Sequence, residues 1–235
     1  MIIYAIIRFT TCPIFIGLFK YNKSVIALIK PIFIRILPVA FETLIASFVR
    51  DQIGIAENFL SVPLAAHLND NLKALFDKSA MHQAGIGNDL LQNHNITVRG
   101  DLIYWLDRSH NDTFENDFLD LIDKFVAYLN ETCYTGITGY EFHYTRYAEG
   151  SFYQRHIDRF RTDTDREFSM IVYLNPDWQQ DDGGELCIHQ NGEQQNISPS
   201  GCKGVFFRSS ELEHEVLLTN KPRMSITGWL KTSLK

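Results

Sequence analysis

The sequence has few cysteines and no pair of them at the spacing of a metal or redox motif. Its four cysteines are widely separated, and no Cys-x-x-Cys pair occurs: Cys12, Cys133, Cys187 and Cys202. Zinc ribbons depend on such pairs, and small secreted domains depend on dense disulfide frameworks. The pattern argues against both classes and fits a reducing compartment, so we expect a cytoplasmic protein.

Basic charge is also scarce. The chain has 22 lysines and arginines against 28 acidic residues, a formal net charge of −6. General nucleic-acid binding needs a positive surface, so no nucleic-acid partner is expected. Internal repeats, low-complexity tracts, a P-loop and a GxGxxG fingerprint are absent as well. Nothing therefore points to a repeat architecture or to a nucleotide-binding loop.

The N-terminal segment lacks a hydrophobic run long enough to span a bilayer. Residues 1–41 carry five basic side chains and no acidic one, and their longest uncharged stretch, 9–19, has 11 residues. A span needs roughly 18 or more, and no clean signal-peptide cleavage site follows. We interpret residues 1–40 as an apolar, basic extension of unassigned role. It fits a segment preceding the domain, a peripheral membrane or partner contact, or packed structure.

Regular patterning begins near residue 41, and residues 41–235 are expected to form a single domain. Residues 41–49 have helical spacing. Ser61 is a suitable N-cap for a second helix with Pro63 in its first turn. Asp112 and Glu115 form a capping-box pattern before a third apolar helical face. These helices are expected to support the fold within residues 41–135.

Segments with a period of two dominate the C-terminal half and predict strands. They cover residues 97–106, 139–147, 168–175, 184–190, 204–209, 214–219 and 224–231. Turn-rich stretches such as 148–151 and 181–184 separate them. Short strands at this spacing predict an α+β fold. Its core, about residues 97–231, is expected to be a double-stranded β-helix, or jelly roll, supported by the N-terminal helices.

The segment from Tyr153 to Asp158 carries a candidate metal site. His156 and Asp158 are two residues apart, so on a strand or at its end they project to the same side. His214, at the head of a later strand, supplies a third ligand. Two imidazoles and one carboxylate leave part of the coordination sphere open, as Fe(II) chemistry with oxygen requires. An isolated His-x-Asp triplet is weak evidence, so the prediction depends on its surroundings.

Arg223, nine residues after His214, strengthens the prediction. If the strands 214–219 and 224–231 pair through the turn 220–222, Arg223 and Ser225 fall near the ligand histidine. A buried guanidinium there binds a carboxylate bidentately, although Arg223 alone also fits a strand-edge salt bridge. His143 and His189 lie in strand-like segments too. They could be ligands of a competing zinc site, but neither has a carboxylate or second histidine at a useful spacing, so we interpret them as packed or surface residues.

Three blocks resemble the 2-oxoglutarate/Fe(II) dioxygenases, in particular the prolyl 4-hydroxylase branch and its EGL-9/SM-20-like group, which has bacterial members. They are residues 98–107 (VRGDLIYWLD), 146–158 with 169–188, and 214–229, and the resemblance spans about 55–231. It implies Fe(II), with 2-oxoglutarate and O₂ as co-substrates and ascorbate as a reductant. It also implies a prolyl residue of a protein or peptide as substrate, with succinate and CO₂ as co-products.

The resemblance further implies roles for single residues. His156, Asp158 and His214 match the iron triad. Arg223 and Tyr173 match residues that bind the far carboxylate of 2-oxoglutarate, with Thr227 lining the same pocket and Tyr147 near the iron. The substrate side is matched by an aromatic wall, a backbone contact and a closing loop: Trp229, Arg166, Arg99 and Asp101. Arg99 and Asp101 fit a local ion pair equally well. The loops 148–151 and 159–167 depart from the family pattern and leave the substrate open.

Four other functions are weighed against this one. The same centre could hydroxylate a free amino acid or another metabolite, and the sequence does not separate that from a peptide substrate. Nucleic-acid demethylation is disfavoured by the acidic composition. A non-catalytic jelly-roll binding module would usually lack a triad member or the arginine, and all four are present. A zinc hydrolase would need a general base beside a metal-bound water. The oligomeric state is not indicated.

Overall fold

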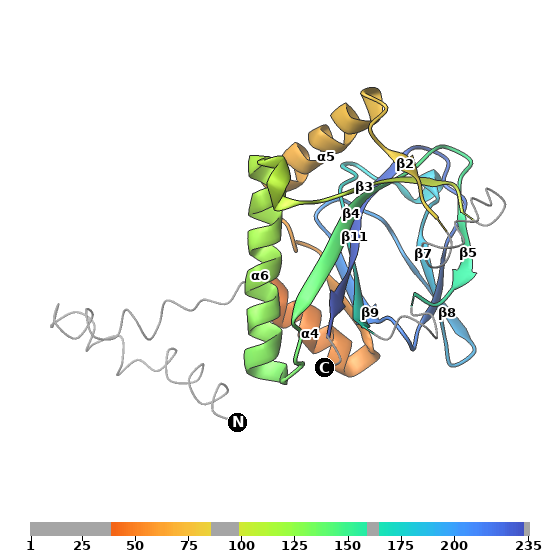
Figure 1. Ribbon diagram of the computed structural model, residues 1–235. Helices are drawn as coiled ribbons and strands as arrows, with labels where there is room; N and C mark the ends of the chain where they lie inside the picture. Colours follow the sequence, from red (N-terminus) through yellow and green to blue (C-terminus); the bar gives the residue numbers. More distant parts are fainter. Residues whose placement is uncertain (1–38, 86–98, 159–164, 233–235) are drawn as a thin grey trace, which may run out of the picture. The chain divides into compact units, whose positions relative to one another are not determined.

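A computed structural model describes residues 39–85, 99–158 and 165–232. Two antiparallel β-sheets lie face to face, and three helices cover the outer face of the larger sheet (Figure 1). The predicted α+β fold with a jelly-roll core is confirmed. Apart from Val39 and Ala40, which open the first described helix, the predicted extension 1–40 lies outside the described residues.

The helices are α4 (Val39–Asp51), α5 (Val62–Asp77) and α6 (Thr113–Cys133), with 3-10 turns η1 (Arg108–His110) and η2 (Gln180–Asp182). The Ser61 hydroxyl caps α5 as predicted, with Pro63 in the first turn. Asp112 caps α6 by accepting two backbone N–H groups. The Glu115 carboxylate does not complete the expected capping box and instead contacts His110 Nδ1 at 3.0 Å. Among the described residues, no helix is both long and apolar enough to cross a membrane.

The seven-stranded major sheet has the order β1-β9-β6-β11-β4-β3-β2, and the four-stranded minor sheet has the order β5-β10-β7-β8. The major strands are β1 (Ile53–Ala56), β2 (His82–Gln83), β3 (Asp101–Trp105), β4 (Gly139–Tyr147), β6 (Arg166–Tyr173), β9 (Gly204–Arg208) and β11 (Arg223–Lys231). The minor strands are β5 (Tyr153–His156), β7 (Leu186–Gln190), β8 (Glu193–Ile197) and β10 (Glu213–Val216).

One predicted strand pairing is wrong. Strand β10 pairs with β5 and β7, whereas β11 pairs with β4 and β6 in the other sheet. Two backbone hydrogen bonds hold the segment that connects β10 to β11. Thr219 N–H donates to Ser151 O at 3.0 Å, and Asn220 N–H donates to Asp182 O at 2.8 Å. The chain therefore crosses from one sheet to the other after β10 instead of forming a hairpin.

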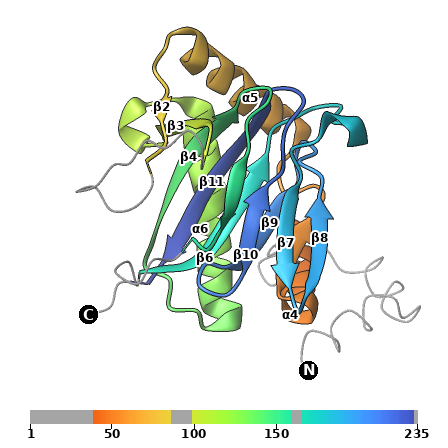
Figure 2. The same ribbon diagram turned by 90° about the vertical axis from the view of Figure 1, so that its right-hand side faces the viewer.

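Two apolar clusters hold the layers together. The first joins the helices to the outer face of the major sheet, with Phe118 and Phe125 of α6 against Phe142 and Phe206. The second lies between the sheets and includes Ile171, Tyr173, Leu186, Ile188, Val205 and Phe207. Figure 2 views the molecule from the side of the minor sheet, with the helices behind the major sheet. Each fully buried large apolar side chain contributes roughly 1.5–3 kcal/mol.

Candidate active site

A cavity of about 430 Å³ lies between the two sheets. Ten of the eleven residues predicted for the site line it: Arg99, Asp101, Tyr147, His156, Asp158, Arg166, His214, Arg223, Thr227 and Trp229. The eleventh, Tyr173, is fully buried beside the cavity with its ring 5.0 Å from the Arg223 guanidinium. The fold thus brings together residues that lie up to 130 positions apart in the chain.

The register of the major sheet explains how these side chains meet. Tyr147 on β4 lies directly opposite Arg223 on β11 and Asp101 on β3. Farther along, Trp229 on β11 lies opposite Ser169 on β6. Because residues at even spacing along a strand share a face, all these side chains project toward the minor sheet.

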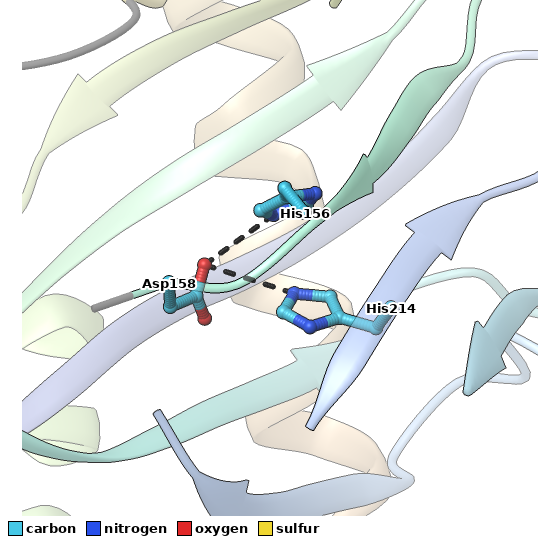
Figure 3. A group of neighbouring side chains, drawn as sticks. All are labelled: His156, Asp158 and His214. Atoms are coloured by element: carbon cyan, nitrogen blue, oxygen red, sulfur yellow. Dashed lines mark ion pairs between the residues drawn. The ribbon is translucent and has the colours of Figure 1, made fainter. Parts of the chain in front are cut away.

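The predicted iron triad converges at the cavity wall. His156 ends β5 and lies opposite His214 on β10, and Asp158 follows two residues later. The distance from Asp158 Oδ1 is 3.4 Å to His156 Nε2 and 3.7 Å to His214 Nε2 (Figure 3). One ligand atom from each residue lies within 4.8 Å of the others, so the three can bind one ion.

Hydrogen bonds prepare both histidines for metal binding through Nε2. His156 Nδ1 lies 2.8 Å from Gln154 O, and His214 Nδ1 lies 3.0 Å from Leu212 O. A carbonyl oxygen only accepts, so each Nδ1 carries the proton and each Nε2 presents its lone pair. Burial lowers the pKa of His214, which keeps this imidazole neutral at pH 7.

Asp158 is oriented by a pair of buried serines. Ser169 Oγ donates to Asp158 Oδ2 at 2.6 Å and lies 2.8 Å from Ser209 Oγ, which leaves Oδ1 directed at the histidines. Burial opposes ionisation of this carboxyl. His214, His156 and the Ser169 hydrogen bond outweigh that effect and hold the pKa of Asp158 well below its usual range. The donor set fits a divalent cation with open coordination positions.

Arg223 is a buried cation without a counter-ion among the described residues. Its side chain is 2% exposed, and its Nε donates to Gly184 O at 2.8 Å, while one terminal nitrogen has no hydrogen-bond partner in the described part of the chain. The same holds for the buried Tyr173 hydroxyl. An uncompensated buried charge is costly, so the pair of unpartnered groups fits a site for an anion, and a guanidinium suits a carboxylate.

Gly184 makes room for this arginine. A Cβ at Gly184 would lie 3.1 Å from Arg223 Cδ and 2.9 Å from Thr219 Oγ1, and the backbone there has φ +67°. Both features favour glycine. The sequence Asp-Asp-Gly-Gly therefore does more than form a turn, since it carries the carbonyl that fixes Arg223.

Two ion pairs include residues that line the cavity. Arg99 contacts Asp101 through two hydrogen bonds of 2.6 and 2.7 Å, so the local ion pair expected as one alternative is formed, and Asp101 is fully buried. Arg166 pairs with Glu141 at 2.8 Å, and its guanidinium lies 3.5 Å from the centre of the Trp229 ring.

Sequence reasoning did not single out Ser169 or connect His143 with the cavity. His143 is buried as expected of a packed residue, yet it lines the cavity between Trp105 and Trp229. Burial lowers the pKa of His143 to about 4, so it is neutral at pH 7. Its even spacing from Thr145 and Tyr147 was the available signal, because all three then share one face of β4.

His189, which has no second ligand at a useful sequence spacing, has two potential ligands close to it in space. Glu215 Oε1 lies 2.8 Å from His189 Nε2, and Cys187 is also close. Sequence spacing could not show this, because Glu215 comes from β10, the strand beside β7.

Comparison with known proteins agrees with this geometry. The sequence model of the 2OG-Fe(II) oxygenase superfamily matches residues 142–231. A prolyl-4-hydroxylase from Pseudomonas putida is 28% identical with a TM-score of 0.74, covering 83% of this chain and 100% of its own. A prolyl hydroxylase from Trichoplax adhaerens, solved with a hypoxia inducible factor peptide, is 23% identical with a TM-score of 0.73 and coverage of 81% and 88%. A viral collagen prolyl hydroxylase from Paramecium Bursaria Chlorella virus-1, solved with 2-oxoglutarate, is 18% identical with a TM-score of 0.55. The match covers 78% of this chain and 97% of the viral one.

Fold, site and sequence model together support a 2-oxoglutarate- and Fe(II)-dependent oxygenase. Within that class, the findings support an enzyme of the prolyl hydroxylase type. Fe(II), 2-oxoglutarate and O₂ are the cofactor and co-substrates that this family implies, and the His156, Asp158 and His214 triad fits the iron.

Proposed function

We propose that the protein hydroxylates a prolyl residue of a protein or peptide, using Fe(II), 2-oxoglutarate and O₂ and releasing succinate and CO₂. The observation that carries the chemistry is the cavity itself, where an open His-Asp-His triad lies with a buried, uncompensated arginine. The prolyl substrate is supported by the likeness to the Pseudomonas putida prolyl-4-hydroxylase and by the VRGD block at residues 98–101.

Each role follows from the contacts of the residue. Arg223 and Tyr173 would bind the far carboxylate of 2-oxoglutarate with their unpartnered donors. His156, Asp158 and His214 would hold the iron, which when bound supplies the oxidising chemistry that places one oxygen atom of O₂ on a substrate carbon. The carbonyls behind the histidines and Ser169 behind Asp158 fix the ligand atoms.

The outer residues of the cavity would position the substrate and exclude water. Trp229 and Tyr147 form aromatic walls on either side of Thr227, all on strands of the major sheet. Such walls shield a reactive centre from solvent. Among the residues that line the cavity, Arg166 and the Arg99–Asp101 pair are the groups we expect to contact the backbone of a peptide.

The test is mass spectrometry of host lysate incubated with the purified protein, Fe(II), 2-oxoglutarate and ¹⁸O₂. The expected result is one oxygen-18 atom on a proline of one protein. The label should be lost in the His214→Ala variant. It should be kept in the control His67→Gln, which changes a histidine of α5 outside the cavity. Succinate without a labelled peptide would overturn the protein substrate in favour of a free amino acid or another metabolite. If iron is bound and neither labelled peptide nor succinate forms, the proposal that the protein is an enzyme is overturned.

A further inference from the structure

A second group of metal-ligating side chains lies on the minor sheet, on the face opposite the iron pocket. Along β7, Leu186 and Ile188 pack between the two sheets. The alternating residues Cys187 and His189 therefore project from the other face. Glu215 on β10 lies directly opposite Cys187 in the register of the two strands. Strand pairing thus places a thiol, an imidazole and a carboxylate together.

The distances show that these side chains converge. His189 Nε2 lies 2.8 Å from Glu215 Oε1 and 3.7 Å from Cys187 Sγ, and one ligand atom of each lies within 4.8 Å of the others. Cys187 is 2% exposed, and the His189 side chain is 9% exposed. The Glu215 side chain is 27% exposed, so it is the ligand of the group that solvent reaches most.

We propose that Cys187, His189 and Glu215 form a second metal site, which takes zinc(II) and is separate from the iron centre. Sulfur, nitrogen and oxygen donors together are a ligand set that zinc accepts, with water in the fourth position. Donor atoms about 2.0–2.3 Å from a tetrahedral ion lie roughly 3.4–3.6 Å apart. The sulfur–nitrogen distance of 3.7 Å is already close to this range, and the His189–Glu215 hydrogen bond would open as the ion enters. The thiol proton leaves to solvent when the zinc–sulfur bond forms.

The surroundings of His189 support this assignment. The side-chain amide of Gln194 lies 3.4 Å from His189 Nδ1. Its oxygen can accept the Nδ1 proton once the amide is turned, which leaves Nε2 free for the ion. His189 also lines a surface pocket with Arg155, Glu213 and Gln194, so an ion has a path from solvent. This site has sulfur where the iron centre has none, and it does not depend on the proposed substrate.

Cobalt(II) is the probe that separates the two sites. Bound to a thiolate it gives a sulfur-to-cobalt charge-transfer band in the near-ultraviolet, which the His156, Asp158 and His214 site cannot produce. The full chain should bind two cobalt ions and show this band. His214→Ala should lose one ion and keep the band. Cys187→Ser should lose one ion together with the band.

Matched variants test the other ligands. Cys133→Ser and Cys202→Ser, which change cysteines outside the group, should retain the band. His189→Gln and Glu215→Gln should weaken cobalt binding to this site at least about tenfold. A wild-type chain with no band at saturating cobalt would overturn the proposal, and so would a band that persists in Cys187→Ser. Far-UV circular dichroism and a cooperative melt establish that each variant is folded, and if Cys187→Ser fails to fold, Glu215→Gln and the wild-type stoichiometry decide.

Discussion

Arg223 carries its charge in a place where the described residues offer no counter-ion. A lysine keeps that charge but loses the planar fork that binds a carboxylate through two hydrogen bonds. We therefore predict that Arg223→Lys raises the KM for 2-oxoglutarate about tenfold or more, and that Arg223→Ala raises it further. Steady-state succinate assays measure both. An unchanged KM in Arg223→Ala would show that the co-substrate binds elsewhere.

Two buried tyrosine hydroxyls without partners in the described chain allow a matched comparison. Tyr173 lies beside Arg223, whereas Tyr144 faces the helices on the other side of the major sheet. We predict that Tyr173→Phe raises the KM for 2-oxoglutarate several-fold, because one neutral hydrogen bond contributes about 1 kcal/mol. Tyr144→Phe should leave this KM unchanged. Equal effects in the two variants would contradict the role of Tyr173.

At the residue scale, sequence spacing indicated the candidate ligands but not the residues that orient them. His156 and Asp158 are two apart, so their shared direction can be read without a structure. Ser169 lies 11 positions after Asp158 on another strand, β6, and a serine on a strand has no distinguishing pattern. Arg223 was placed correctly beside the iron ligands for a partly wrong reason, because the hairpin expected to bring it there does not exist.

At the scale of elements, strand β11 is the central support of the site, because it pairs with β4 and β6 along most of its length. A Cβ at Gly228 would lie 2.2 Å from Glu141 O and 2.3 Å from Phe142 Cδ1, so β4 would have to move. We predict that Gly228→Ala lowers the free energy of unfolding by about 3 kcal/mol or prevents folding. Urea denaturation measures the loss.

The control is Gly139→Ala at the start of β4, where a Cβ would meet nothing within 4 Å. It should change the free energy of unfolding by less than about 1 kcal/mol. A similar loss in both variants would mean that strand glycines are sensitive here for reasons unrelated to close approach.

The prediction of helices and strands succeeded where the hydrophobic periodicity was strong and failed where it was weak. The capped helices α5 and α6 and the apolar strands β4, β6 and β11 match the predicted segments closely. Strand β8 reads EQQNI, and its first four residues are exposed, so no apolar alternation marked it. The pairing of β10 depends on tertiary structure, because it is determined by which sheet each strand joins.

At the scale of the whole molecule, buried histidine makes the stability of the fold depend on pH. The pKa of His143 falls from an ordinary 6.5 to about 4 through burial, so the unfolded chain takes up a proton first as the pH decreases. The contribution of neutral His143 to the free energy of unfolding is complete above pH 6.5. It decreases by up to about 3 kcal/mol as the pH falls from 6.5 to 4. His214, whose pKa burial also lowers, adds to the same trend.

Urea unfolding of metal-free protein between pH 4 and 7 should therefore show a slope that is shallower in His143→Leu than in the wild type. Asp101, Arg99 and Arg166 act on the same imidazole and remain in that variant. An identical slope in both proteins would show that His143 takes up its proton at the same pH in the folded and unfolded states, which contradicts the prediction.

The jelly roll and its two-layer core were predictable as a whole, because alternating strands and amphipathic helices have few ways to bury their apolar faces. The cavity between the sheets was not predictable, since its lining depends on the register of eight strands from both sheets. A one-residue shift in any of them would turn its side chains away from the cavity.

The most direct test of the account is the conversion of 2-oxoglutarate to succinate by the purified protein with Fe(II) under air. We expect turnover in the wild type, its loss in Asp158→Ala and His214→Ala, and its retention in His67→Gln. Turnover that survives in Asp158→Ala or His214→Ala would contradict the assignment of the iron triad.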